Sequence, residues 1–254
     1  MITEDGETSA ARMDIAGDAL LRPVRSGNAF EETVNRLLQT IRLGIVAPGD
    51  ALAPERELAA RFSVSRDTVR VAIKSLSDAG FLVSRRGRYG GTFVLEGLPP
   101  RGGPRVIEGL TASAPITNEA IDDVLALREI LEVGATRAAA ARSLSAADRE
   151  LLWARLGETA AASIADYRRL DSRLHLTIGE LVGAPSLVPL LADNRMHVNE
   201  LLENIPLLQP NIEHSNQQHE AVVIAILTGD VERAAVAMLE HLDGSATLLR
   251  GFLS

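Results

Sequence analysis

Four polar side chains in the second half of the sequence have the types and the spacing of a metal site. Asp171 and His175 are four residues apart, so a helix places both on one face. His219 and His241 lie ten residues before and twelve residues after Gly229. If antiparallel helices flank this glycine, both imidazoles lie about 15–18 Å from the turn and can face one point. One carboxylate and three imidazoles suit Zn²⁺, with Ni²⁺ and Mn²⁺ as alternatives.

The elements that must position these side chains have a helical pattern. From about residue 117 to the end of the chain, apolar residues recur at helical spacing and strand signals are lacking. Breaks are expected near residues 143–145, 183–185, 205–206 and 229, where Ser, Gly and Pro interrupt the pattern. The sequence therefore predicts six or seven helices, forming an all-helical domain over residues 117–254.

A different pattern covers residues 30–96. Helical spacing runs from Phe30 to Gly44, then over about 54–62, and again from Ser65 to about 79, where Gly80 ends it. The β-prone runs FLVS and TFVL follow, joined by RRGRYGG, which predicts a hairpin. This order is typical of a winged helix-turn-helix. The expected fold class is mostly α, with this domain and its small β-hairpin wing preceding a C-terminal helical bundle.

Two further segments complete the domain organisation. Residues 1–29 are rich in Gly, Ala and acidic residues, and we expect a flexible tail. Residues 97–116 begin with GLPPRGGPR, whose glycines and prolines prevent regular structure and predict a linker.

The third helix of the N-terminal domain has the composition of a DNA-reading helix. Arg66, Arg70 and Lys74 recur every four residues and share one face, opposite an apolar stripe. A helix in the major groove needs donors near its N-terminus, and arginine grips guanine edges or phosphates bidentately. The hairpin tip adds further arginines, and its glycines allow close approach of the backbone. The candidate DNA-binding residues are Arg56, Ser65, Arg66, Thr68, Arg70, Gly87 and Arg88.

Composition limits the class of protein. The chain has no cysteine, which excludes disulfides and thiol chemistry. It has no apolar run long enough for a membrane span, and its acidic N-terminus is unlike a signal peptide, so we expect a cytoplasmic protein. The net charge is −8, yet residues 30–97 hold ten Lys and Arg against eight Asp and Glu. That asymmetry is expected if one domain meets phosphates and the other does not.

The run GIVAPGDALAPERELAARFSVSRDTVRVAIKSLSDAGFLVSRRGRYGGTFV resembles the DNA-binding domain of the GntR family, over residues 30–95. The matching motifs are PGD-x-L, E-R-E-L-A, V-S-R-x-T-V-R and G-x-G-T-F-V. One departure is Ala53-Pro54, where members commonly have Pro followed by a small residue. The resemblance implies that the family's DNA-contacting positions are those of Arg56, Arg66, Thr68, Arg70 and Gly87.

Residues 117–250 are similar to the helical FCD-type effector domain of one GntR subfamily. The similarity rests on LALREILEVGATRAAA, on the D-x-x-x-H at Asp171, and on HEAVVIAILTGDVERAAVAMLEHL. Two departures are Leu174, where a large aromatic is usual, and Gly183-Ala184, where Gly-Asn is favoured. In metal-binding members the matching positions hold the ion, which implies the ligand set Asp171, His175, His219 and His241.

Arg128 and Arg195 are the candidates for pairing with an acidic effector, because a guanidinium grips a carboxylate as a fork. A structural salt bridge is the alternative role for each. His197 and His214 match no motif, and we expect them at the surface.

The sequence predicts a DNA-binding transcription regulator, acting as a repressor and as a homodimer on a palindromic double-stranded operator. A small carboxylate effector, bound near a metal in the C-terminal domain, is expected to modulate operator affinity. One alternative is a regulator that senses the ion itself. A metal-dependent hydrolase is the other, but the sequence offers no separate general base and the DNA-binding domain argues against it, so no enzyme is expected.

Overall fold

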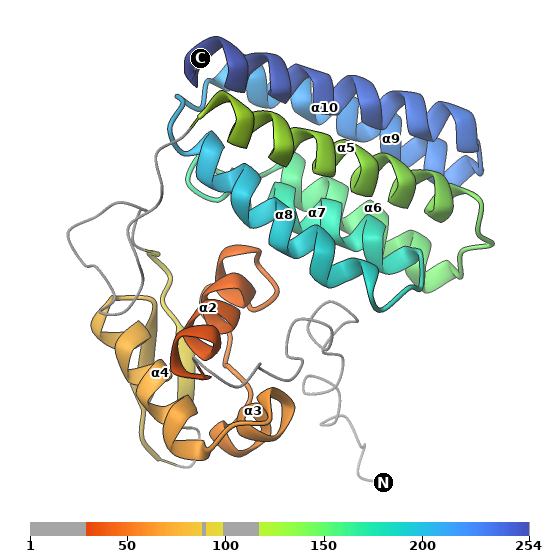
Figure 1. Cartoon of the computed structure of the whole chain (residues 1–254). Coiled ribbons are helices and arrows are strands. Elements are labelled where there is room, and N and C mark those ends of the chain that lie inside the picture. Colours follow the sequence, from red (N-terminus) through yellow and green to blue (C-terminus); the bar gives the residue numbers. More distant parts are fainter. Residues whose placement is uncertain (1–28, 88–89, 99–116, 254) are drawn as a thin grey trace, which may run out of the picture.

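The computed structural model describes residues 29–87, 90–98 and 117–253. The predicted tail up to residue 28, Arg88, and residues 99–116 of the predicted linker lie outside this part of the chain. Figure 1 shows a small N-terminal domain below a larger bundle of helices. The mostly helical class, with a two-stranded hairpin in the N-terminal domain, is confirmed.

The N-terminal domain follows the predicted order of elements. The antiparallel strands pair Leu82 with Val94 and Arg85 with Gly91. The helices pack around a core that includes Leu37, Phe62 and Leu76. The elements are α2 (Ala29–Arg42), α3 (Glu55–Phe62), α4 (Arg66–Asp78), β1 (Leu82–Arg85) and β2 (Gly91–Val94).

Local chemistry explains the helix boundaries of this domain. Ser65 caps α4, where its Oγ accepts a hydrogen bond from the backbone N–H of Thr68 at 3.0 Å. Gly80, with φ of +84°, follows the end of α4. Pro54, expected near the first turn of the second helix, is the N-cap residue of α3. Ser63 adopts a left-handed conformation with φ of 55°, which turns the chain between α3 and α4.

Six helices form the described C-terminal domain. The expected breaks near residues 143–145, 183–185, 205–206 and 229 all fall between helices. An additional break between residues 160 and 167 was not predicted. The helices are α5 (Asn118–Ala140), α6 (Ala146–Ala160), α7 (Tyr167–Leu181), α8 (Leu187–Leu202), α9 (Gln209–Thr228) and α10 (Val231–Leu253). None of the helices in the described ranges is long and apolar enough to cross a membrane.

Helix α7 lies at the centre of the bundle. Every residue from Asp171 to Leu181 is buried, and α7 contacts α5, α6 and α8. Helix α5 in turn packs against α7, α8, α9 and α10, between α8 and α10 in Figure 1. Polar side chains on the inner faces of α5, α7, α9 and α10 are therefore brought together away from water.

The two domains meet where α2 ends. Leu43 belongs to the N-terminal domain, yet its fully buried side chain packs with residues of α5, α7 and α8. Beside it, Gln39 Nε2 donates to Asp193 Oδ1 of α8 at 2.8 Å. The N-terminal domain is thus docked on α7 and α8.

Candidate metal centre and nucleic-acid interface

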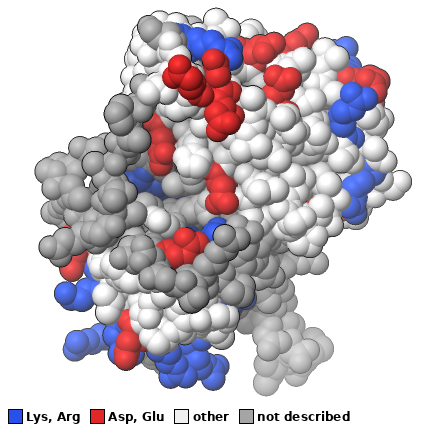
Figure 2. Space-filling view, viewed as in Figure 1, with Lys and Arg blue, Asp and Glu red and all other residues white. Residues whose placement is uncertain are grey.

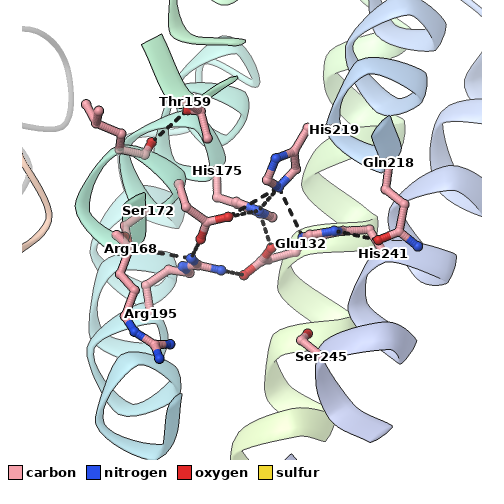
Figure 3. Close-up of polar contacts among 12 residues, drawn as sticks. Glu132, Thr159, Arg168, Ser172, His175, Arg195, Gln218, His219, His241 and Ser245 are labelled. Carbon is pink, nitrogen blue, oxygen red and sulfur yellow. Dashed lines mark hydrogen bonds and ion pairs between the residues drawn. The ribbon is translucent and has the colours of Figure 1, made fainter. Parts of the chain in front are cut away.

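The four predicted ligands converge in the interior of the helical bundle, although they come from three helices. Asp171 and His175 lie on α7, His219 on α9 and His241 on α10, and all four are buried. One ligand atom from each lies within 4.8 Å of all the others. The Nε2 atom of His219 is 3.3 Å from Nε2 of both His175 and His241 (Figure 3). The same atom is 3.3 Å from Asp171 Oδ1.

These separations fit a bound metal ion. Two Zn–N bonds of about 2.0–2.1 Å at a tetrahedral angle hold their nitrogens about 3.3–3.4 Å apart. Three Nε2–ligand separations of 3.3 Å match that value, and the separation between His175 Nε2 and Asp171 Oδ1 is longer, at 3.8 Å.

The contacts of the outer ring nitrogens with buried acceptors support the same fit. His175 Nδ1 contacts Glu132 Oε2, and His241 Nδ1 lies 3.3 Å from Gln218 Oε1. Both partners are acceptors, because Gln218 uses its own Nε2 to donate to the backbone of Glu240. Each Nδ1 therefore carries the proton, and the Nε2 lone pairs of His175 and His241 point inward together. A cation between these lone pairs would relieve their repulsion.

Charged residues around the four ligands form a second buried cluster. Arg195 of α8 bridges two carboxylates: its Nη2 contacts Asp171 Oδ2, and its Nη1 lies 3.4 Å from Glu132 Oε1. Arg128 of α5 donates from Nε to the same Glu132 oxygen at 3.1 Å, and from Nη1 to Ser245 at 2.7 Å. The two arginines singled out in the sequence thus lie beside the candidate metal centre, each paired with protein carboxylates.

Glu132 is the residue of this cluster that the sequence interpretation missed. It is 2% exposed and is shared by His175, Arg128 and Arg195. Its one local signal was the four-residue spacing from Arg128, which places both on one face of α5. That spacing is common on helix surfaces, so it did not distinguish this carboxylate.

Burial and neighbouring charges set the protonation states. Burial alone raises the pKa of Asp171, but Arg195, with His219 and His175, holds that pKa well below its usual value. Burial likewise raises the pKa of Glu132, yet His175 and the two arginines outweigh it and hold that pKa well below its usual value. Burial lowers the pKa of His241 and of His175. Ionised carboxylates and neutral imidazoles are the states that metal ligation requires. His197 and His214, by contrast, are exposed on α8 and α9, as expected.

The predicted DNA-reading residues lie on one exposed part of the N-terminal domain. Arg56, Ser65, Arg66 and Arg70 are exposed, and Thr68 is partly exposed. In Figure 2, Lys and Arg gather at the end of this domain farthest from the helical bundle. Arg70 lies 2.9 Å from Asp67 and 3.4 Å from Glu55, which hold its guanidinium near the start of α4.

The hairpin supplies the second part of this surface. Gly87 is exposed with φ of +113°, a conformation that favours glycine, and a Cβ there would meet nothing within 4 Å. Gly90 is constrained more tightly, because a Cβ would lie 2.5 Å from the carbonyl oxygen of Arg85. The guanidinium of Arg85 lies 4.9 Å from the centre of the Phe93 ring, which orders the base of the wing.

Comparison with known families gives a match to each domain. Residues 30–94 match the family described as bacterial regulatory proteins, gntR family, and residues 123–244 match the FCD domain. Two curated relatives are regulators of similar length. The putative L-lactate dehydrogenase operon regulatory protein of Escherichia coli K12 is 28% identical over 229 residues, covering 87% of this chain and 86% of the relative. The regulator LutR of Bacillus subtilis 168 is 28% identical over 224 residues, covering 84% and 97%.

A solved structure shares the fold. Escherichia coli McbR/YncC matches with a TM-score of 0.54 and 16% identity, over 88% of this chain and 97% of that chain. The helix-turn-helix with its basic exposed face, joined to a helical domain, defines a DNA-binding transcription regulator and not an enzyme. The chain combines a DNA-binding domain of the gntR family, over residues 30–94, with an FCD domain, over residues 123–244.

Proposed function

We propose that this regulator is a repressor that binds a palindromic operator as a homodimer, and that a small carboxylate modulates its operator affinity at a metal centre in the FCD domain. The observation that carries the proposal is the convergence of Asp171, His175, His219 and His241, with the Nε2 lone pairs of His175 and His241 facing inward. A bound ion supplies Lewis-acid positions that favour carboxylate oxygens. Zn²⁺ is the proposed ion, with Ni²⁺ and Mn²⁺ as alternatives.

The chain's own residues support an acidic effector. With ionised carboxylates and neutral imidazoles, Asp171 and Glu132 balance the charges of Arg128 and Arg195. A divalent ion adds two positive charges to this buried cluster, and a buried net charge is costly unless an anion accompanies it. The E. coli relative, named for an L-lactate dehydrogenase operon, directs the choice of effector towards small hydroxy acids. We propose Arg128 and Arg195 as the groups that orient the acid.

On the DNA side, we propose that the α4 N-terminus enters the major groove and that the wing contacts the adjacent backbone. Arg56, Ser65, Arg66, Thr68 and Arg70 are the proposed contacts on α3 and α4. Gly87 and Arg88 are the proposed contacts of the wing. The working domain division is 30–96 for DNA binding and 117–254 for effector binding and dimerisation, in a cytoplasmic protein.

Elemental analysis by plasma mass spectrometry tests the metal centre, with wild type beside His219→Ala and the exposed-histidine control His214→Ala. About one metal per chain is expected in wild type and in the control, and none in His219→Ala. Absence of metal from all three proteins would overturn the metal centre and leave DNA binding intact.

The effector claim is tested by fluorescence anisotropy on the operator, with a panel of small acids that begins with L-lactate. Zinc alone shifting the affinity would favour a regulator that senses the ion.

A further inference from the structure

Glu132 is in direct contact with one candidate ligand and with both arginines, without being a ligand itself. Its Oε2 faces Nδ1 of His175, and its Oε1 accepts from Arg195 (Figure 3). The same Oε1 also accepts from Arg128. The side chain is 2% exposed, so these partners take the place of water around the carboxylate. A carboxylate in this position affects both the orientation and the basicity of the imidazole.

The three histidines differ in what holds their outer nitrogen. His175 has a charged acceptor in Glu132, and His241 has a neutral one in Gln218 at 3.3 Å. His219 Nδ1 is buried, and among the described residues it has neither a hydrogen bond nor an ion-pair contact. A carboxylate acceptor makes an imidazole a stronger ligand than an amide does, because it stabilises positive charge transferred to the ring. His175 is therefore the imidazole of the three whose ring faces a carboxylate at its outer nitrogen.

One arginine, Arg195, supports both ligands of α7 through ion pairs. Arg195 joins Glu132, which holds His175, to Asp171. His219 on α9 lies 3.3 Å through Nε2 from Asp171 Oδ1, but the outer nitrogens of His219 and His241 face no charged group among the contacts of the described residues. The outer nitrogen of His175 is thus the one that faces a carboxylate, whereas that of His241 faces the neutral Gln218.

We propose that Glu132 is a positioning residue of the metal centre, which fixes the Nδ1–H tautomer of His175 and aims its Nε2 lone pair at the ion. This inference rests on the proposed metal centre. Glu132 acts through His175 and does not contact the ion. Its substitution lowers metal affinity by weakening a ligand, while the four donor residues all remain.

The main test compares Zn²⁺ affinity, by competition with a chelator, for wild type, Glu132→Gln and the control Glu129→Gln. Glu129 is exposed on the same helix, so its substitution removes the same charge outside the centre. Glu132→Gln is expected to bind Zn²⁺ about 10–100-fold more weakly than wild type and the control. The d–d absorption of the Co²⁺-substituted protein is expected to change in Glu132→Gln alone. Affinity within twofold of wild type, in folded Glu132→Gln protein, would overturn the inference.

Glu132→Gln leaves two guanidinium groups with one carboxylate fewer, so a charge-balanced variant, Arg128→Gln with Glu132→Gln, is measured in parallel. If only the double variant folds, its Zn²⁺ affinity decides the matter by the same criterion.

A further measurement needs no variant of Glu132. The chain has five histidines, so ¹⁵N spectra of Zn²⁺-loaded, histidine-labelled wild type resolve each ring, with His175 assigned by His175→Gln. His175 is expected as the Nδ1–H tautomer with the Nδ1 proton farthest downfield of the three buried rings. A His175 ring without an Nδ1 proton would refute the inference. Wild type that binds no Zn²⁺ would overturn the metal centre itself, which distinguishes the two failures.

Discussion

Replacing Leu43 with alanine tests how firmly the two domains are joined. Leu43 follows α2 in the N-terminal domain, but its fully buried side chain packs with Ala135, Leu176, Leu191 and Ala192 of the helical domain. The substitution removes three carbon atoms from this cluster. At about 0.8 kcal/mol for each buried methylene, the transfer contribution is roughly 2 kcal/mol, and the cavity left behind raises the cost to about 2–4 kcal/mol.

Differential scanning calorimetry measures this loss. For a chain of this size, 1 kcal/mol shifts the midpoint Tm by about 2–4 °C, so a decrease of about 5–15 °C is expected. Because the lost contacts join the domains, we also expect the domains to unfold in two separated transitions. The control is Leu127→Ala, at a position on α5 that is 46% exposed and so costs little. A Leu43→Ala protein that melts within 1 °C of wild type, in one transition, would refute this account of the interface.

Three further outcomes are expected. Arg66→Ala, at an exposed position of α4, is expected to weaken operator binding by about 1–3 kcal/mol, and anisotropy titrations at several salt concentrations separate a base contact from a phosphate contact. Gly90→Ala places a Cβ 2.5 Å from the Arg85 carbonyl, so the wing must shift; we expect weaker operator binding with unchanged circular dichroism, and unchanged binding would contradict a role for the wing. Zn²⁺ affinity is expected to fall as the pH is lowered, because protons compete for the imidazoles. The fall is expected to begin below the pH at which a free imidazole titrates, because burial lowers the pKa of His175 and of His241. A chelator-competition affinity that does not fall at any pH at which the protein stays folded would exclude histidine ligation.

Helix boundaries were predictable wherever a residue with a special backbone or capping preference marked them. Ser65, Gly80 and Gly229 each lie at the helix end where the sequence placed them. The break between α6 and α7 escaped prediction because residues 161–166 contain neither Gly nor Pro. There the chain is turned by Ser163, whose Oγ accepts from the Asp166 N–H at 3.2 Å and donates to its carboxylate. In the sequence alone, Ser163 and Asp166 cannot be distinguished from ordinary exposed polar residues.

The candidate site likewise contains residues that the sequence could predict and one residue, Glu132, that it could not. Spacing alone placed Asp171 beside His175 on one face, and the turn at Gly229 placed His219 level with His241. Glu132 could not be found by such arguments, because two of its three partners lie on α7 and α8. Contacts between helices depend on packing geometry, which a single sequence does not specify.

The arrangement of α7 and α8 suggests how the metal centre and the DNA-binding domain are connected. On α7, Arg169 packs against Gly44, where a Cβ would lie 3.0 Å from Arg169 Cγ, and Asp171 faces the centre two residues later. On α8, Asp193 contacts Gln39, and Arg195 reaches the centre two residues later.

Residues two apart on a helix point about 200° apart, so each of these helices has one face on the DNA-binding domain and the other on the centre. Asp171 and Arg195 are themselves paired, which ties the two helices together at the centre. An effector that changed this ion pair would therefore act on the two helices that hold the DNA-binding domain, and its effect need not pass through the rest of the bundle.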